Sequence, residues 1–164
     1  MSRVLTPLRT AAAISRGFKL KQTIMNSDMN FSSVVELFAE ILAQDNILLS
    51  VNSGNGICEA RVEEGLTFRI REKWATIGDE SRPWHIHLNM KEVREARFVK
   101  EDRSDGRQGY SIRFFDSKGN LAMRANFVGM YDSDGNLIKE KVDRYDEIHR
   151  KFGGSGSLLL KGNN

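Results

Sequence analysis

Two histidines, His85 and His87, stand two residues apart in the second half of the chain, within the apolar run of residues 84–90. Side chains alternate between the two faces of a β-strand, so these imidazoles share one face while the apolar side chains of the run share the other. Imidazole is a common ligand of iron, zinc and copper. In a chain with only three histidines, this spacing predicts a metal or haem site, with His87 as the first candidate ligand and His85 as the second.

A haem needs more than iron ligation, because its propionates require cations and its porphyrin faces require apolar walls. Arg113 and Arg124 are candidate partners for the propionates, and Phe115 is a candidate wall residue. For each of them taken singly, a place on a solvated strand face is the more common role. The third histidine, His149, falls on the apolar stripe of a predicted helix, where we expect a core histidine with a hydrogen-bonded ring nitrogen.

Other chemistries find no support in the sequence. Residues 132–136 lack the glycine and glutamate positions of a calcium loop, and residues 53–56 lack the Lys-Ser or Lys-Thr of a phosphate loop. The chain has no Gly-x-Ser-x-Gly sequence, and its single cysteine, Cys58, has no evident base partner. We therefore expect no hydrolase or nucleotide site, and we expect Cys58 to be a small buried side chain.

The elements that would position these residues can be predicted from spacing. Residues 33–44 suit an amphipathic helix, because Ser33 and Glu36 make a capping box before apolar residues at helical spacing. A loop ending at Pro83 precedes the second half, where Gly119 and Asn120 favour a tight hairpin. A closing helix with one buried stripe is predicted over residues 134–152. The predicted strands are residues 46–53, 56–62, 66–73, 84–90, 96–100, 110–116 and 121–128.

The chain of 164 residues is 40% hydrophobic, which suits one domain with a real core. Residues 1–25 carry five basic residues and no acidic one, so residues 1–30 are read as a basic segment that is disordered or directs import into an organelle. A single domain then covers residues 31–153, and residues 154–164 form a flexible tail. The 25 basic and 22 acidic residues make a mixed surface, so no nucleic-acid partner is expected.

The compartment and the membrane relation follow from the same composition. The longest apolar run of the basic segment, residues 11–14, is far too short to span a bilayer. The lone Cys58 cannot form an internal disulfide, which agrees with a reducing compartment. We therefore expect a cytoplasmic protein without a membrane span, with organelle import as the alternative.

The order of helix, strands and helix predicts an α+β domain with an extended antiparallel sheet flanked by helices. Within it, the run "IHLNMKEVREARFVKE", followed by "GYSIRFFDSKGNLAMRANFVG" and a helix, resembles the ChuX/HutX family of haem-utilisation proteins and the half-domains of HemS-type haem carriers. The segment "FFDSKG" matches the family's phenylalanine pair, acidic residue and Lys-Gly step. The resemblance covers roughly residues 45–152.

This resemblance implies a saddle-like antiparallel sheet that binds haem on one surface, with a role in intracellular haem carriage, storage or iron utilisation. Some relatives degrade haem, so a reductant-dependent, oxygenase-type enzyme is an alternative. A family histidine that approaches haem aligns with Asn52 in this chain, which favours as a further alternative a regulatory or interaction domain that does not bind haem. A second histidine region of the family falls near His85. The open sheet edge is a candidate homodimer surface.

Overall fold

The computed structural model describes residues 32–154 and 157–160, so the basic segment predicted over residues 1–30 lies outside the described part of the chain. Two α-helices are described, α1 (Ser32–Leu42) and α2 (Lys139–Ile148), and α2 continues into a π-helical turn, η1 (His149–Gly153). The described strands are β1 (Ile47–Asn52), β2 (Ile57–Arg61), β3 (Phe68–Arg71), β4 (Trp74–Ile77), β5 (Ile86–Asn89), β6 (Val93–Asp102), β7 (Gln108–Asp116), β8 (Leu121–Phe127) and β9 (Ser157–Leu159).

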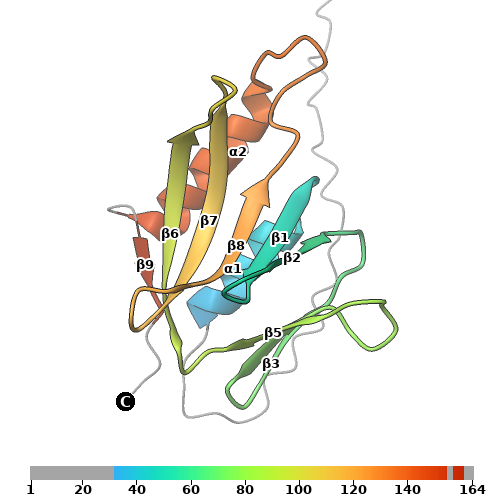
Figure 1. The fold of residues 1–164 in the computed structure, drawn as a ribbon, viewed down its shortest axis with the longest axis vertical. Coiled ribbons are helices and arrows are strands. Elements are labelled where there is room, and N and C mark those ends of the chain that lie inside the picture. Colours follow the sequence, from blue (N-terminus) through green and yellow to red (C-terminus); the bar gives the residue numbers. More distant parts are fainter. Residues whose placement is uncertain (1–31, 155–156, 161–164) are drawn as a thin grey trace, which may run out of the picture.

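These strands form two separate sheets (Figure 1). The large sheet has six strands in the order β2-β1-β8-β7-β6-β9, and the small sheet has three in the order β3-β4-β5. Every neighbouring pair is antiparallel. The predicted α+β class with antiparallel strands and flanking helices is therefore confirmed. The predicted hairpin is the pair β7–β8, in which Ile112 lies opposite Ala125.

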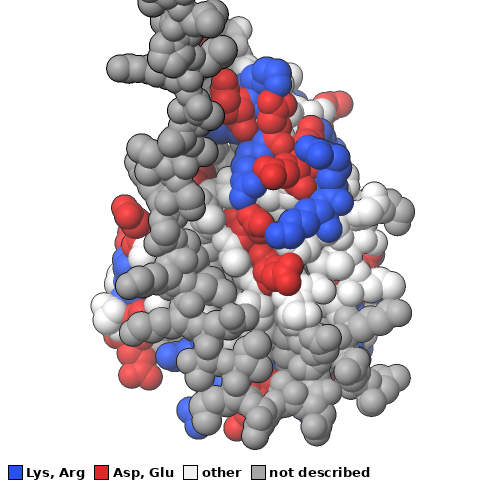
Figure 2. All heavy atoms as spheres, turned by 180° about the vertical axis from the view of Figure 1, so that it is seen from behind, with Lys and Arg blue, Asp and Glu red and all other residues white. Residues whose placement is uncertain are grey.

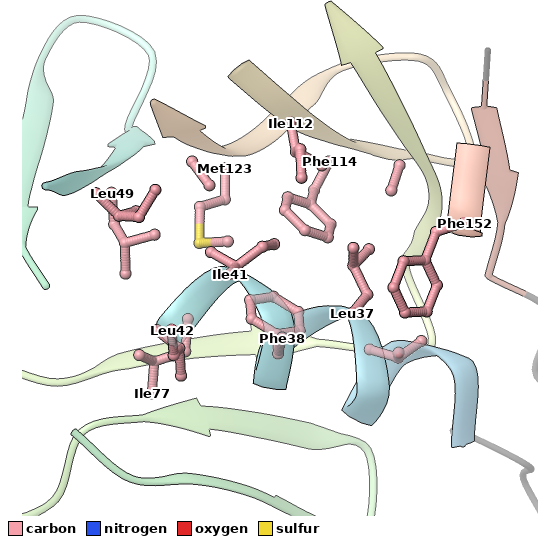
Figure 3. Close-up of a cluster of buried hydrophobic side chains, with 14 of the residues drawn as sticks. Leu37, Phe38, Ile41, Leu42, Leu49, Ile77, Ile112, Phe114, Met123 and Phe152 are labelled. Atoms are coloured by element: carbon pink, nitrogen blue, oxygen red, sulfur yellow. The ribbon is translucent and has the colours of Figure 1, made fainter. Parts of the chain in front are cut away.

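Helix α1 lies between the two sheets and joins them through its apolar face (Figure 3). The fully buried Phe38 stacks on Phe68 of β3 and on Phe114 of β7, with ring centres 4.6 Å and 5.0 Å apart. No described strand of the small sheet pairs with one of the large sheet, so the shared core around α1 is what holds the sheets together. The other buried side chains of the helix are Val34, Val35, Leu37, Ile41 and Leu42.

Helix α2 covers the large sheet through Tyr145, which is fully buried. Its hydroxyl lies 3.1 Å from the Ser111 carbonyl oxygen and 3.2 Å from that of Val99, and donates to this pair. Burial raises the pKa of Tyr145 far above its ordinary value, so the phenol stays neutral and donates at physiological pH. The ring makes edge contacts with Phe98, Tyr110 and Phe127.

His149 begins the π-helical turn, and its ring stacks on Phe98 with centres 4.8 Å apart and planes 11° from parallel. Its Nε2 is buried and has no hydrogen-bond partner among the described residues. We expected a core histidine with a hydrogen-bonded ring nitrogen, but His149 is only half-buried and its Nε2 makes no described hydrogen bond. The ring packs face to face against Phe98, and this stacking, rather than a hydrogen bond to Nε2, holds the ring in place.

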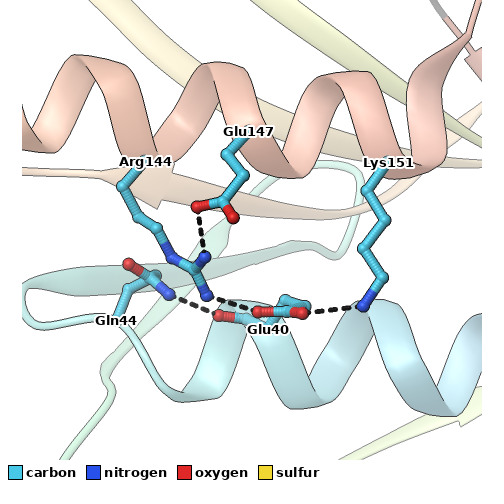
Figure 4. Close-up of polar contacts among 5 residues, drawn as sticks. All are labelled: Glu40, Gln44, Arg144, Glu147 and Lys151. Carbon is cyan, nitrogen blue, oxygen red and sulfur yellow. Dashed lines mark hydrogen bonds and ion pairs between the residues drawn. The ribbon is translucent and has the colours of Figure 1, made fainter. Parts of the chain in front are cut away.

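A charged cluster ties the two helices together on their outer side (Figure 4). The Glu40 carboxylate of α1 accepts from Arg144 of α2 and from Lys151, whose Nζ lies 2.9 Å away. Arg144 also pairs with Glu147 one turn further on. Seen from behind, the same region shows basic and acidic side chains side by side rather than a patch of one sign (Figure 2).

We predict that Glu40 makes stability depend on acid pH. Burial opposes its ionisation, but the hydrogen bond from Lys151 and the charges of Arg144 and Lys151 outweigh burial and lower the pKa of Glu40. Its contribution is therefore complete above the unfolded value of about 4.3 and is lost as pH falls through the lower folded value. Glu40→Gln should cost about 1 kcal/mol at pH 7 and almost nothing at pH 2, as measured by urea unfolding.

The more exposed Glu147 provides the matched control for Glu40. Glu147→Gln also removes one partner of Arg144, yet it should change the free energy of unfolding by less than about 0.5 kcal/mol at either pH. Equal losses for the two variants at pH 7 would contradict a special role for Glu40.

The structure corrects several local expectations. Cys58, expected to be buried, is exposed, because β2 is an edge strand on which only Ala60 is covered. Within the expected C-terminal tail, residues 157–159 form β9, which pairs with β6, and Leu160 is buried behind it. Helix α1 begins at Ser32, so Ser33 lies inside its first turn and is not the cap.

Two element bounds also differ from those expected. The closing helix begins at Lys139 rather than at residue 134, because Tyr131 and Leu137 form a bridge that closes the intervening residues into a turn. Strand β4 was not expected at all, since residues 66–73 were read as one strand followed by a loop. The turn between β3 and β4, at Glu72 and Lys73, contains no glycine or proline to mark the end of the first strand.

Candidate functional site

The small sheet has one buried face and one open face. Its inner side chains, including Ile70, Ala75 and Leu88, belong to the core around α1. Since side chains alternate along each strand, the residues between them point away from the core. The register then places Arg69 of β3 opposite Thr76 of β4, and Thr76 opposite His87 of β5. A cation, a hydroxyl and an imidazole therefore form one row across the open face.

A second row follows directly along the strands. Arg71 of β3 lies opposite Trp74 of β4, which lies opposite Asn89 of β5. The indole of Trp74 is 40% exposed, a large apolar surface left open beside the first row. Its ring meets the His87 ring edge-on with centres 6.4 Å apart. The open face thus combines an exposed aromatic ring with two arginines and a histidine.

All the side chains of the two rows except Asn89 line a cavity of about 670 Å³, which lies within the range of about 300–1,000 Å³ usual for small-molecule and cofactor sites. Its lining includes two acidic residues, Glu72 and Glu80, besides the two arginines, so formal charge is balanced around it. Its full lining is Arg69, Ile70, Arg71, Glu72, Trp74, Thr76, Glu80 and His87.

The His87 ring is oriented by a hydrogen bond with Thr76. Nδ1 of the ring lies 2.9 Å from Oγ1 of Thr76, whose side chain is almost completely buried. When Nδ1–H donates to this hydroxyl, Nε2 carries the free lone pair. Metal-binding histidines are usually held in this way by a hydrogen bond at the other ring nitrogen. The contact therefore suits His87 to coordinate a metal through Nε2.

The structure brings His85 and His87 together. His85 lies one residue before β5, both side chains are exposed, and their ring centres are 4.8 Å apart. The predicted pair of imidazoles on one side of the chain is thus present as a contact. Groups of three or more metal-binding side chains were not found among the described residues, so any metal here would complete its coordination with other ligands.

The other predicted site residues lie elsewhere, on the outer face of the large sheet. Arg113 of β7 and Arg124 of β8 are directly opposite each other. Arg113 pairs with Glu101, while the buried Nε of Arg124 has no hydrogen-bond partner among the described residues. Phe115 lies under the guanidinium of Arg97, 4.2 Å from its ring centre. No described contact joins these residues to the two histidines, so the structure does not assemble the predicted set into one site.

Asn52, the position aligned with a family histidine, has a local structural role. Its Oδ1 accepts a hydrogen bond of 2.8 Å from the Gly54 backbone nitrogen at the end of β1. This contact stabilises the turn into β2. The Asn52 side chain is therefore engaged in stabilising the turn between β1 and β2.

Sequence reasoning missed Arg69, Arg71, Trp74 and Thr76. A signal was present, because residues 68–71 and 74–77 each alternate inward apolar side chains with outward ones. Two short strands of this kind around a two-residue turn form a hairpin. The turn itself contains Glu72 and Lys73, which are not typical turn residues, and this concealed the hairpin.

A sequence model of one protein family matches residues 35–153, well over half of the chain. Together with the structural matches, it places the chain in the ChuX/HemS-like family. No curated protein sequence matches the chain. None of the described helices is long and apolar enough to cross a membrane.

Solved structures with the same fold share little sequence with this chain. A structure of the haem-binding protein ChuX matches with a TM-score of 0.60 and 15% identity, over 73% of this chain and 72% of ChuX. A protein from Erwinia carotovora matches with a TM-score of 0.61 and 16% identity, over 75% and 73% of the two chains. Holo-PhuS, a haem-binding protein from Pseudomonas aeruginosa, matches with a TM-score of 0.54 and 15% identity, over 72% of this chain but only 33% of PhuS.

Proposed function

We propose that the protein binds haem on the open face of the small sheet and serves in its intracellular carriage or storage. The observation that carries this proposal is the His87 imidazole, oriented through Nδ1 by Thr76 at the wall of a cavity of cofactor size. The haem-binding relatives ChuX and PhuS share the fold, which supports haem as the ligand. Fold alone does not assign it, because one fold hosts many functions.

The chemistry of the lining fits a haem. His87 would hold the iron through Nε2, since Nδ1 is engaged by Thr76. Arg69 and Arg71 project from the same face of β3 and supply the two cations that propionates need, in place of the predicted Arg113 and Arg124. The exposed indole of Trp74 supplies the apolar wall predicted for Phe115. A bound haem would bring a redox-active iron, which a carrier shields rather than uses.

The other side chains that line the cavity favour carriage of haem over its degradation. Its titratable side chains besides His87 are Arg69, Arg71, Glu72 and Glu80, and none of these is a second histidine or a cysteine, the side chains that most readily exchange a proton near neutral pH. We therefore assign no catalytic residue. Reductant-dependent breakdown of haem with a biliverdin-like product would show that the protein is instead a degrading enzyme.

Haem titration of the purified chain tests the proposal. We expect the Soret band of haem to shift on binding, and we expect His87→Ala to change the band position and weaken binding at least tenfold, as the loss of a metal contact does. The double variant Arg69→Gln/Arg71→Gln should weaken binding while leaving the Soret position unchanged, because it touches the propionates and not the iron.

The matched control is Arg113→Gln/Arg124→Gln, which removes two arginines from the large sheet. It should bind haem like the unaltered chain. Loss of binding in this control with normal binding by His87→Ala would place haem on the large sheet instead. Absence of any Soret shift with the unaltered chain at micromolar concentration would leave the protein as an interaction domain that keeps the fold without haem.

A further inference from the structure

His85 and His87 lie close enough together to share a bare metal ion, which requires no porphyrin. Their ring centres are 4.8 Å apart and their planes differ by 69°. A metal about 2.1 Å from one nitrogen of each ring would place two imidazole centres about 5 Å apart at coordination angles between square and tetrahedral. The observed separation of the ring centres therefore matches the separation that two imidazoles on one ion require.

The rings are also free to bind. Both side chains are exposed, and no carboxylate forms an ion pair with either ring among the described residues. Thr76 fixes His87 from the side of Nδ1. Of the charged groups in the adjacent cavity, Glu72 and Glu80 offset Arg69 and Arg71, so the local field does not repel a cation strongly.

We propose that His85 and His87 bind a divalent first-row transition metal ion, with Cu(II) bound most tightly. Imidazole nitrogens favour copper, nickel and zinc over magnesium and calcium, and affinity for such sites peaks at Cu(II). Only two protein ligands are available among the described residues, so water fills the remaining positions and the ion exchanges readily. The inference goes beyond haem binding and does not depend on it.

One consequence is competition between the two ligands. Coordination of a bare ion through the free nitrogen of His87 and coordination of haem iron through the same nitrogen exclude each other. A bound divalent ion should therefore weaken haem binding. His85→Ala should remove this competition while keeping His87 available for haem.

Quenching of tryptophan fluorescence by Cu(II) tests the chelate. The chain has two tryptophans, of which Trp74 lies 6.4 Å from His87 between ring centres and Trp84 directly precedes His85. A copper ion held between the histidines should therefore quench their emission. The titration is made with CuCl2 in a non-coordinating buffer on a Cys58→Ser background, because the exposed thiol of Cys58 would itself react with Cu(II).

We expect saturable quenching with one ion per chain. His85→Ala and His87→Ala should each weaken it about 100-fold, because a chelate loses the effective concentration of its second ligand. The control His149→Phe should bind as before, since the half-buried His149 is stacked on Phe98 of β6 rather than placed beside His85 and His87. Equal quenching after replacement of both His85 and His87 would overturn the proposal, as would no quenching of the unaltered chain at millimolar Cu(II). Copper binding without haem binding would refute only the proposed haem function.

Discussion

Replacing Phe38 with alanine is expected to lower the free energy of unfolding by about 3–5 kcal/mol, the usual cost of removing a buried phenylalanine ring. The ring is fully buried and stacks on Phe68 of the small sheet and Phe114 of the large sheet. Its removal opens a cavity at the point where α1 joins the two sheets (Figure 3). Small domains have a total free energy of unfolding of about 5–15 kcal/mol, so this variant should be only marginally stable. Urea unfolding followed by circular dichroism measures the loss.

A graded variant keeps this prediction testable where Phe38→Ala does not fold. Phe38→Leu retains most of the apolar volume and should cost about 1–2 kcal/mol. Glu36→Ala on the exposed side of the same helix is the control and should stay within about 0.5 kcal/mol of the unaltered chain. A cost for Phe38→Leu no larger than that of Glu36→Ala would show that the stack does not hold the sheets together.

The loss should not be uniform, because the small sheet depends on α1 more than the large sheet does. The small sheet has only three strands, and none of them pairs with the large sheet. Its attachment is the shared core, in which Phe68 and Ile77 meet α1. Hydrogen exchange in Phe38→Leu should therefore accelerate more in β4 than in β7. The candidate site with His87 is thus built on the less strongly held sheet.

The large sheet could be predicted from sequence because its signals are local. The run of residues 110–116, the turn at Gly119 and the run of residues 121–128 together specify two strands, their pairing and their faces. The turn fixes the register, and the register places Ile112 and Phe114 inward. The same alternation correctly placed Arg113 and Arg124 on the opposite face. In this part of the chain, local pattern and tertiary structure agree.

Only part of the small sheet could be predicted from sequence, because the turn of its first hairpin, between β3 and β4, is unusual. Glu72 adopts a φ of 53°, a left-handed conformation that is uncommon outside glycine, asparagine and aspartate. A prediction that places turns at Gly, Pro and Asn therefore extends β3 into the turn and does not find β4. Because β4 was not predicted, Trp74 and Thr76 were not recognised as site residues. The hydrogen bond that orients His87 could not be predicted either.

Periodicity also cannot decide which sheet a strand joins. It indicated that His85 and His87 share a face and that Arg113 and Arg124 share another, but not that β5 pairs with β4 while β7 pairs with β6 and β8. The two sheets separate between the consecutive strands β5 and β6, which do not pair with each other, and periodicity within a strand does not reveal such a break. The predicted site therefore combined residues that the fold keeps on separate sheets.

Replacing Gly153 with alanine is expected to cost about 3 kcal/mol, at the upper end of overpacking penalties, because the new methyl group has no room. A Cβ at this position would overlap Cδ2 of the His149 ring and would lie 2.8 Å from Cδ2 of Phe98. Those two rings are stacked on each other, so neither can move away without disturbing its partner. Gly153 is itself buried. The clash should show as a lower urea midpoint with an unchanged m-value.

The matched control and a double variant separate this clash from other effects of glycine. Gly56→Ala meets only the Ser53 hydroxyl at 3.4 Å and should stay within about 0.5 kcal/mol of the unaltered chain. His149→Ala removes the overlapping ring, so the costs of Gly153→Ala and His149→Ala should sum to at least 1 kcal/mol more than the cost of the double variant, as expected for residues in direct contact. Strictly additive costs would mean that Gly153 is required by the backbone of the π-helical turn and not by the ring packed against it.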